Sequence, residues 1–180
     1  RLQREPLWLC GPRFALLAKV YQRAARYRFH REVRSIGIFM GGTDPGGISA
    51  RVLSACRAAG FGGPLEVVST SANPHLAALR HACQRDRATT LTLDQPDLAT
   101  FFARHDLQIG AGGGATWERC CIGAPTVALS LATNQSAVVP GLAALGVVRA
   151  ADEATLPAVL AKLIADPAAR QALAERAAAL

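Results

Sequence analysis

The stretch that decides the fold is LQIGAGGGATWERCCIGAPTVAL, residues 107–129. It opens on an apolar run at 107–109, passes through a glycine-rich turn into a helical stretch at 116–122, and returns to an apolar run at 126–129. Gly123 stands where the helix should end, because glycine readily adopts the left-handed conformation that closes many helices. A strand, a helix and a second strand in this order predict a βαβ unit with parallel strands.

The same alternation recurs along the chain from residue 35. Further apolar runs lie at 36–40, 65–69, 91–93 and 147–148. Further helical stretches lie at 48–59, 74–85, 97–104, 136–145 and 155–165, and a last one begins at 167. Strands of a parallel sheet are covered on both faces and read as continuous apolar runs, as these do. We therefore predict an α/β domain, a Rossmann-like three-layer fold with a six-stranded parallel sheet.

Local signals mark several helix ends. Asn73-Pro74 and Asp166-Pro167 each place a capping residue before a proline at the first helical position. Gly60 and Gly146, like Gly123, follow helical stretches.

The net charge of +7 is concentrated in residues 1–34. That segment has nine Lys and Arg against two Glu, whereas the remaining 146 residues have eleven basic and eleven acidic side chains. We interpret 1–34 as a basic linker and the tail of a missing N-terminal domain, and 35–180 as the domain proper. A nucleic-acid patch and contact with anionic lipid are the alternatives for 1–34, but the neutral body and the absence of a known motif argue against nucleic acid. The chain begins with Arg1 and without a signal-peptide pattern, so we expect it to start inside a longer protein.

Cysteine and histidine usage predicts neither a metal site nor a cofactor. The five cysteines are odd in number and form no CxxC pair, which is typical of reduced core thiols in a cytoplasmic protein. The four histidines show no spacing with Cys or carboxylates that resembles a metal site. No apolar stretch approaches the roughly 20 residues of a transmembrane segment.

In open parallel sheets, ligands bind beyond the carboxyl ends of the strands, and two loops there are rich in glycine. The first, GGTDPGG at 41–47, follows the first strand. Glycine lets the backbone approach a ligand, so Gly41, Gly42 and Thr43 are candidate contacts. A tight turn with Thr43 or Asp44 capping the next helix is the alternative.

The second loop, GAGGGAT at 110–116, presents backbone N–H groups at a helix N-terminus, which suits phosphate. A close contact between helix and sheet is the alternative. The loop also fits G-x-G-x-x-A, but it belongs to the fourth βα unit and the next acidic residue after Glu118 is Asp152, so NAD binding is disfavoured.

Glu118, one turn into the helix, could accept two hydrogen bonds from vicinal ribose hydroxyls, or could be a surface residue favouring the helix start. The loop 131–136, with Asn134 and Gln135, is a weaker signal for phosphate or sugar.

In the order of these loops along the chain, the sequence resembles the C-terminal domain of proteins of the GT-B glycosyltransferase superfamily, family 28 type. This domain is one half of the two-domain GT-B fold. Within this superfamily, the chain is most similar to the UDP-sugar hydrolases of pseudaminic acid biosynthesis and the related spore-coat polysaccharide proteins. The likeness spans nearly all 180 residues. The matching stretches are GGTD at 41–44, IGAGGGATWERCCIGAP at 109–125, NQ at 134–135 and the leader LCGPRFALL at 9–17.

The resemblance implies a domain that binds UDP or a UDP-sugar. Glu118 would hold the ribose hydroxyls, and Leu93 would meet uracil through its backbone. The pyrophosphate would bind the donors of the second glycine loop, namely Gly112, Gly113, Gly114, Ala115 and Thr116. Asn134 and Gln135 would face the phosphates or the sugar.

The resemblance also implies that no catalytic residue lies in this chain. The hydrolases carry a Gly-x-Gly-His segment in their N-terminal domain, and no such segment occurs here. We expect this fragment alone to be inactive, with its own missing N-terminal domain as partner. Three hypotheses stay open: half of a UDP-sugar hydrolase, the donor-binding domain of a glycosyltransferase, and a non-enzymatic nucleotide-sugar sensor or nucleic-acid binder.

Overall fold

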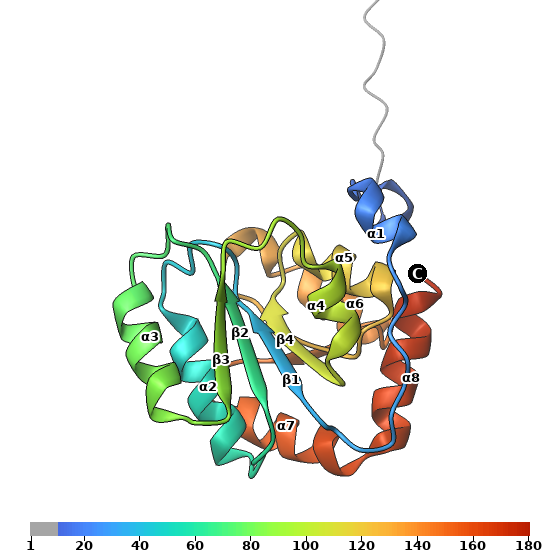
Figure 1. The fold of residues 1–180 in the computed structure, drawn as a ribbon. Coiled ribbons are helices and arrows are strands. Elements are labelled where there is room, and N and C mark those ends of the chain that lie inside the picture. Colours follow the sequence, from blue (N-terminus) through green and yellow to red (C-terminus); the bar gives the residue numbers. More distant parts are fainter. Residues whose placement is uncertain (1–10) are drawn as a thin grey trace, which may run out of the picture.

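A computed structural model describes residues 11–180, apart from the side chain of Arg13, as a twisted sheet between two layers of helices (Figure 1). All pairings in the sheet are parallel, and the strand order is β3-β2-β1-β4-β5-β6. The strands are β1 (Ile36–Phe39), β2 (Leu65–Ser69), β3 (Thr89–Leu93), β4 (Leu107–Ala111), β5 (Thr126–Leu129) and β6 (Arg149–Ala151). The predicted six-stranded parallel sheet is confirmed.

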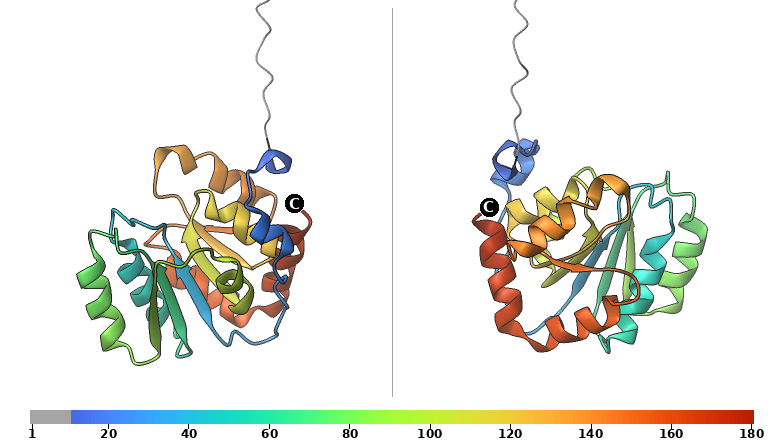
Figure 2. Two further views of the ribbon diagram at one scale, coloured as in Figure 1. Left: turned by 45° about the horizontal axis from the view of Figure 1, so that its top comes forward. Right: turned by 180° about the vertical axis from the view of Figure 1, so that it is seen from behind.

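The helices lie in two groups around this sheet. They are α1 (Lys19–Arg23), α2 (Ile48–Ala58), α3 (Leu76–Arg85), α4 (Ala99–Arg104), α5 (Ala115–Ile122), α6 (Val138–Ala144), α7 (Leu156–Ala165) and α8 (Pro167–Ala178), with 3-10 turns at Pro12–Phe14 and Thr133–Gln135. Helices α2, α3 and α7 cover one face, and α4, α5 and α6 cover the other (Figure 1). Two further views show α7 and α8 meeting at a corner beneath the strands (Figure 2).

Each face of the sheet has its own apolar core. Ile38, Val67 and Ile109 are fully buried against α2 and α7. Val68 packs on the opposite face with Phe102 of α4. Burying a side chain of this size contributes roughly 1.5–3 kcal/mol, so both helical layers are held by the strands they cover. Among residues 11–180, no helix combines the length and apolar character that crossing a bilayer requires.

Several element boundaries differ from the sequence prediction by a few residues, and the local cause is clear for two of them. The last strand lies at Arg149–Ala151, not at 147–148, because Val147 and Val148 are buried against α6 before the chain pairs with β5. Helix α3 begins at Leu76, not at residue 74. There Asn73 forms a turn of its own: its Oδ1 accepts the N–H of His75 at 2.7 Å.

Other helix ends follow the local signals. Asp166 caps α8, its side chain accepting the N–H of Ala169 at 2.9 Å. Gly60, Gly123 and Gly146 all adopt positive φ at the ends of helices, as predicted.

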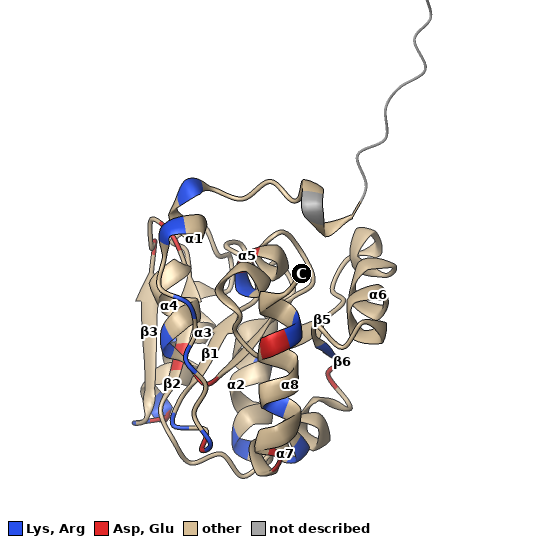
Figure 3. Cartoon of the chain, turned by 90° about the vertical axis from the view of Figure 1, so that its right-hand side faces the viewer, with Lys and Arg blue, Asp and Glu red and all other residues tan. Residues whose placement is uncertain are grey.

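The segment before β1 is not one long helix. Of residues 11–35, only Lys19–Arg23 are α-helical, and from there the chain, with its many basic residues, runs alongside α8 to the first strand (Figures 1 and 3). The side chain of Tyr21 is buried against Phe102. The division between 1–34 and 35–180 stays a prediction, but residues of this segment are part of the packed structure.

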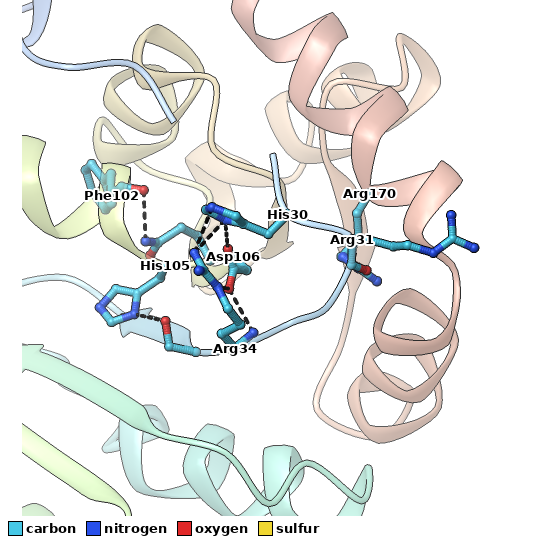
Figure 4. Close-up of polar contacts among 9 residues, drawn as sticks. His30, Arg31, Arg34, Phe102, His105, Asp106 and Arg170 are labelled. Atoms are coloured by element: carbon cyan, nitrogen blue, oxygen red, sulfur yellow. Dashed lines mark hydrogen bonds and ion pairs between the residues drawn. The ribbon is translucent and has the colours of Figure 1, made fainter. Parts of the chain in front are cut away.

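Polar contacts fasten the last part of this segment to the domain (Figure 4). Buried Asp106 lies 2.7 Å from Nδ1 of His30 and accepts the backbone N–H of Arg34 at 2.8 Å. The guanidinium of Arg170, in α8, donates to the carbonyl of Arg31. The chain therefore enters β1 along a fixed path.

Candidate functional site

The two glycine-rich loops leave the sheet side by side. Strands β1 and β4 are neighbours, and Phe39 pairs with Gly110, so the chain beyond each strand emerges at the same carboxyl edge. From there one loop leads to α2 on one face and the other to α5 on the opposite face. This is the point at which the strand order reverses, where α/β sheets of this kind bind ligands.

The loop between β4 and α5 presents three N–H groups that find no acceptor in the described part of the chain. Gly112 donates its N–H to the carbonyl of Leu129 at 2.9 Å, and Thr116 donates to Gly113 at 2.9 Å. Within residues 11–180, the N–H groups of Gly113, Gly114 and Ala115 donate to no acceptor. These donors open the eight-residue helix α5, whose N-terminus carries a partial positive charge. The arrangement suits an anion with several oxygens.

The glycines of this loop fall into two groups, and a different physical reason explains the absence of a side chain in each. A Cβ at Gly110 would lie 2.2 Å from Nη1 of Arg119, and a Cβ at Gly112 would lie 2.1 Å from Cγ2 of Val139. Packing therefore requires these two glycines, as the alternative interpretation of the loop expected. At Gly113 the nearest atom would be 3.7 Å away, and at Gly114 nothing lies within 4 Å. Internal packing does not explain those two glycines, whereas a ligand against the backbone would.

Two predicted contacts have internal roles. Thr116 is fully buried, and its hydroxyl donates to the carbonyl of Ala111 at 3.1 Å while accepting from Nη2 of Arg119 at 3.0 Å. Its N–H and that of Gly112 are also bonded within the chain. The site prediction is revised accordingly: Gly112 and Thr116 hold the shape of the loop, and the free donors belong to the three residues between them.

Glu118 lies in the first turn of α5 and is half-buried. Burial raises the pKa of its carboxyl, and the neighbouring Tyr21 hydroxyl and the charge of Arg119 offset part of that rise. The Tyr21 hydroxyl also accepts the N–H of Leu98, at 3.3 Å, so it lies beside both the carboxylate and the loop after β3. Sequence reasoning missed Tyr21, whose only signal was an aromatic residue within the basic segment.

The loop after β1 is built differently. Buried Asp44 accepts the N–H groups of Ile48 at 2.8 Å and Ser49 at 2.9 Å, so its carboxylate caps α2. The predicted capping role is confirmed for Asp44, while Thr43 is exposed. Because a negative charge already occupies this helix start, an anion is repelled there and is accommodated better at α5.

Gly41 and Gly42 follow β1 at the carboxyl edge of the sheet. Gly41 has φ of 97° with open space around the position of a Cβ, so only glycine takes this conformation without strain. The carbonyl of Gly42 accepts the hydroxyl of Thr70 at 2.8 Å. Both glycines, with Thr43, stay candidate contacts beside the α5 loop.

The remaining candidates come from two other loops. Oε1 of Gln135 accepts the N–H of Leu131 at 2.9 Å, which leaves the side-chain NH2 as a donor beside Gly113. Asn134 precedes it in the same 3-10 turn and is exposed. Leu93 ends β3, three strands from β4, or about 14 Å by the usual strand spacing. Its contact with uracil stays a prediction.

No group of three His, Cys, Asp or Glu side chains in the described part of the chain is arranged to hold a metal ion. Burial raises the pKa of Cys56 to about 12 and the pKa values of Cys83 and Cys120 to about 11. These thiols stay protonated at neutral pH, so they are core residues and not nucleophiles. Cys10 lies outside the described residues.

Comparison with known sequences finds one informative relative. No family model matches the chain. The spore coat polysaccharide biosynthesis protein SpsG of Bacillus subtilis (strain 168) is 29% identical over 134 residues, which cover 71% of this chain and 38% of SpsG. The chain therefore spans well under half the length of this relative.

Comparison with solved structures shows the fold. MurG of Acinetobacter baumannii superposes with a TM-score of 0.58 at 19% identity over 93% of this chain and 49% of MurG. WaaG, a glycosyltransferase involved in lipopolysaccharide biosynthesis, gives 0.65 at 17% identity, covering 84% of this chain and 43% of its own. The spinosyn rhamnosyltransferase SpnG, complexed with thymidine diphosphate, gives 0.61 at 22% identity, covering 87% and 43%. The predicted Rossmann-like half of a GT-B fold is confirmed, as is the resemblance to a spore-coat polysaccharide protein.

Proposed function

We propose that this chain is the UDP-sugar-binding half of a two-domain enzyme that releases a sugar from UDP in polysaccharide biosynthesis. One observation carries the proposal: three unused N–H groups open α5, and a half-buried carboxylate follows one turn later. The relative named for spore coat polysaccharide biosynthesis and a similar fold solved with thymidine diphosphate support it.

The diphosphate would bind at the loop after β4. The N–H groups of Gly113, Gly114 and Ala115, together with the NH2 of Gln135, can donate to phosphate oxygens there. A favourable charge at a helix N-terminus is worth roughly 0.3–1 kcal/mol when exposed and more when partly buried. In the reaction, negative charge grows on the diphosphate as the sugar leaves, and donors already in place stabilise that charge.

The ribose would bind at Glu118. This residue lies four positions beyond Gly114, about 6 Å further along the helix axis. That separation keeps the carboxylate away from the phosphates while leaving it within reach of the adjoining sugar ring. A carboxylate accepts two charge-assisted hydrogen bonds, as two vicinal hydroxyls offer.

The acceptor of the sugar distinguishes two candidate reactions. Transfer to another molecule is favoured by the similar solved structures, which include glycosyltransferases. Transfer to water, as in the UDP-sugar hydrolases, is favoured by the matching stretches at 41–44 and 116–125. In both cases the catalytic base would belong to the partner domain, and this chain alone would bind UDP weakly without turnover. A product assay on the two-domain protein, free sugar against sugar on an acceptor, separates the reactions.

Calorimetric titration of this chain with UDP tests the proposal. We expect saturable binding that weakens from UDP to UMP to uridine, because each lost phosphate leaves loop donors unpaired. Glu118→Ala should weaken UDP binding by about 1.5–3 kcal/mol, the range for a hydrogen bond to a charged group. The proposal would be refuted if UDP did not bind, or if UDP, UMP and uridine bound with equal affinity. Equal affinity of Glu118→Ala would remove this residue from the site.

A further inference from the structure

A fully buried arginine lies directly behind the phosphate loop. The side chain of Arg119 is 0% exposed and extends from α5 toward the sheet. Its Nη2 donates to the carbonyl of Ala111 at 2.9 Å and to the hydroxyl of Thr116 at 3.0 Å. Its guanidinium carbon lies 5.7 Å from the centre of the Phe102 ring. Arg119 therefore contacts both ends of the loop whose N–H groups are free.

This cation forms no ion pair among residues 11–180, and the charge of Glu118 acts on it only from beyond ion-pair distance. Its Nε and Nη1 atoms are buried without an acceptor, and no carboxylate lies within ion-pair distance. Burial lowers the pKa of Arg119 to about 10, so the side chain still carries its charge at neutral pH. Burying an unpaired charge is costly, and proteins rarely keep one without a use for it.

A second buried arginine shows the contrast. Among the described residues Arg170 is also 0% exposed, also lacks an ion pair and also has an Nε without an acceptor, but both of its terminal nitrogens donate to backbone carbonyls, those of Leu163, Ile164 and Arg31. It closes the end of α7 and fastens the segment before β1 (Figure 4). Arg170 thus has a structural role in holding the chain together, far from the carboxyl edge of the sheet.

We propose that Arg119 is a positioning residue for the diphosphate, a buried positive charge that holds the glycine loop in its binding shape and is matched by the phosphates of the bound nucleotide. The inference rests on the proposed function, because it names the residue that supports the same anion site from behind. Arg119 acts through the loop and through its charge, without touching the ligand.

Arg119 helps to fix one particular peptide unit of the loop, the one between Ala111 and Gly112. The carbonyl of Ala111 accepts from both Arg119 and Thr116, while the N–H on the other side of the same peptide unit, that of Gly112, donates to Leu129. With both ends of this peptide bonded, the next three N–H groups start from a fixed orientation. Donors that need no reorganisation bind an anion better than mobile ones.

The charge contributes as well. The guanidinium is shielded from water, so its attraction for an anion on the other side of the loop is weakened less than that of an exposed arginine. Gly110 supplies the space that this placement requires, since a side chain there would overlap Nη1.

A purely structural role of Arg119 predicts a different result. If Arg119 only stacks on Phe102 and bonds a carbonyl, its loss changes the stability of the fold and leaves ligand selectivity unchanged. If it supports the diphosphate, its loss weakens UDP binding and spares uridine. The ratio of the two affinities separates the roles, because a general loss of folded protein lowers both alike.

The test compares Arg119→Met, which keeps the volume and removes the charge, with Arg170→Met as the matched control. UDP binding is measured by calorimetry and uridine binding by NMR titration. We expect Arg119→Met to weaken UDP binding by at least about tenfold, which is less than the roughly 10²–10³-fold loss in rate when a preorganised donor that touches the reacting group is removed, and uridine binding by less than about twofold. Arg170→Met should leave the ratio at the wild-type value. Should Arg119→Met fail to fold, Arg119→Gln serves instead, since it also removes the charge while keeping a polar amide in the buried space.

Arg119→Lys provides the rescue. It restores the charge without the planar fork, so its ratio of UDP to uridine affinity should fall between those of the wild type and Arg119→Met. An unchanged ratio in Arg119→Met or Arg119→Gln, while wild-type protein binds UDP, overturns this inference and leaves the proposed function standing. Wild-type protein that does not bind UDP overturns both.

Discussion

The guanidinium of Arg119 occupies the space that a side chain at Gly110 would need. A Cβ at position 110 would lie 2.2 Å from Nη1 of Arg119 and 2.7 Å from the carbonyl oxygen of Phe39. The arginine can shift its end, but the backbone of β1 cannot. The strand residue and the helix residue are therefore coupled, and the identity of one limits the identity of the other.

This coupling predicts the effect of Gly110→Ala. The added methyl should displace Arg119 and strain the pairing of β1 with β4, which lowers the free energy of unfolding by about 1–3 kcal/mol. Denaturant unfolding measures the change. Gly114→Ala is the matched control: with nothing within 4 Å and helical dihedral angles, it should stay within about 0.5 kcal/mol of the wild type. Equal stability of the two variants would contradict the coupling.

Asp44 is expected to matter for the stability of α2. Its carboxylate is buried and accepts two N–H groups that the helix cannot satisfy internally. Asp44→Ala should cost about 2 kcal/mol, the upper part of the range for lost N-caps. Asp44→Asn keeps one acceptor oxygen and should lose less. Thermal and denaturant unfolding provide the comparison, and an Ala variant as stable as the Asn variant would argue against the capping role.

Glu118 should make UDP binding sensitive to acid. Because burial raises the pKa of this carboxyl, it takes up a proton at a higher pH than an ordinary glutamate. Binding of ribose hydroxyls needs the carboxylate, so affinity should be full above the raised pKa and fall as the pH drops through it. The terminal phosphate of UDP also takes up a proton in acid, so the measured quantity is the difference in UDP affinity between wild type and Glu118→Gln at each pH. A difference that does not change between pH 8 and pH 5 would speak against a carboxylate contact.

Glu66 should stabilise the fold except in strong acid. Burial alone would raise the pKa of its carboxyl, but hydrogen bonds from His105, Arg104 and Thr92 outweigh burial and lower the pKa from 4.5 to about 2. The stabilisation is therefore complete above about pH 4.5 and is lost as the pH falls toward 2. A shift of this size corresponds to about 3 kcal/mol.

Unfolding of Glu66→Gln at pH 7 and at pH 2.5 tests this. The variant should be clearly less stable than the wild type at pH 7, and the gap should narrow in acid. Glu175→Gln, at an exposed position, is the control and should show no such change. A gap that is constant with pH would exclude an ionised, bonded Glu66.

Much of the fold was predictable because its signals are local. Continuous apolar runs marked β1 to β5, and Gly60, Gly123, Gly146 and Asp166 marked helix ends through their own backbone or side chain. The prediction was wrong for the last strand, since burial of Val147 and Val148 against α6 gives the same apolar signal as pairing in a sheet. Local pattern does not distinguish these two ways of being buried.

The candidate site was predictable in outline and not in detail. A triple glycine before a helix indicated an anion site, and Glu118 followed from its place on that helix. The sequence could not reveal that the N–H of Gly112 is taken by Leu129, or that Tyr21 reaches Glu118 from a segment that looked like a linker. Both depend on which distant segments become neighbours.

The sequence by itself determined the alternation of strands and helices, the parallel sheet and the position of the glycine loops, because periodicity and glycine conformation act over a few residues. Only the tertiary structure decided which loop amides are free among the described residues, which carboxylate caps a helix and which buried arginine forms no ion pair beside the loop. Those properties come from hydrogen bonds and exclusion of water between residues far apart in the chain, and they exist only once the strands have taken their order in the sheet.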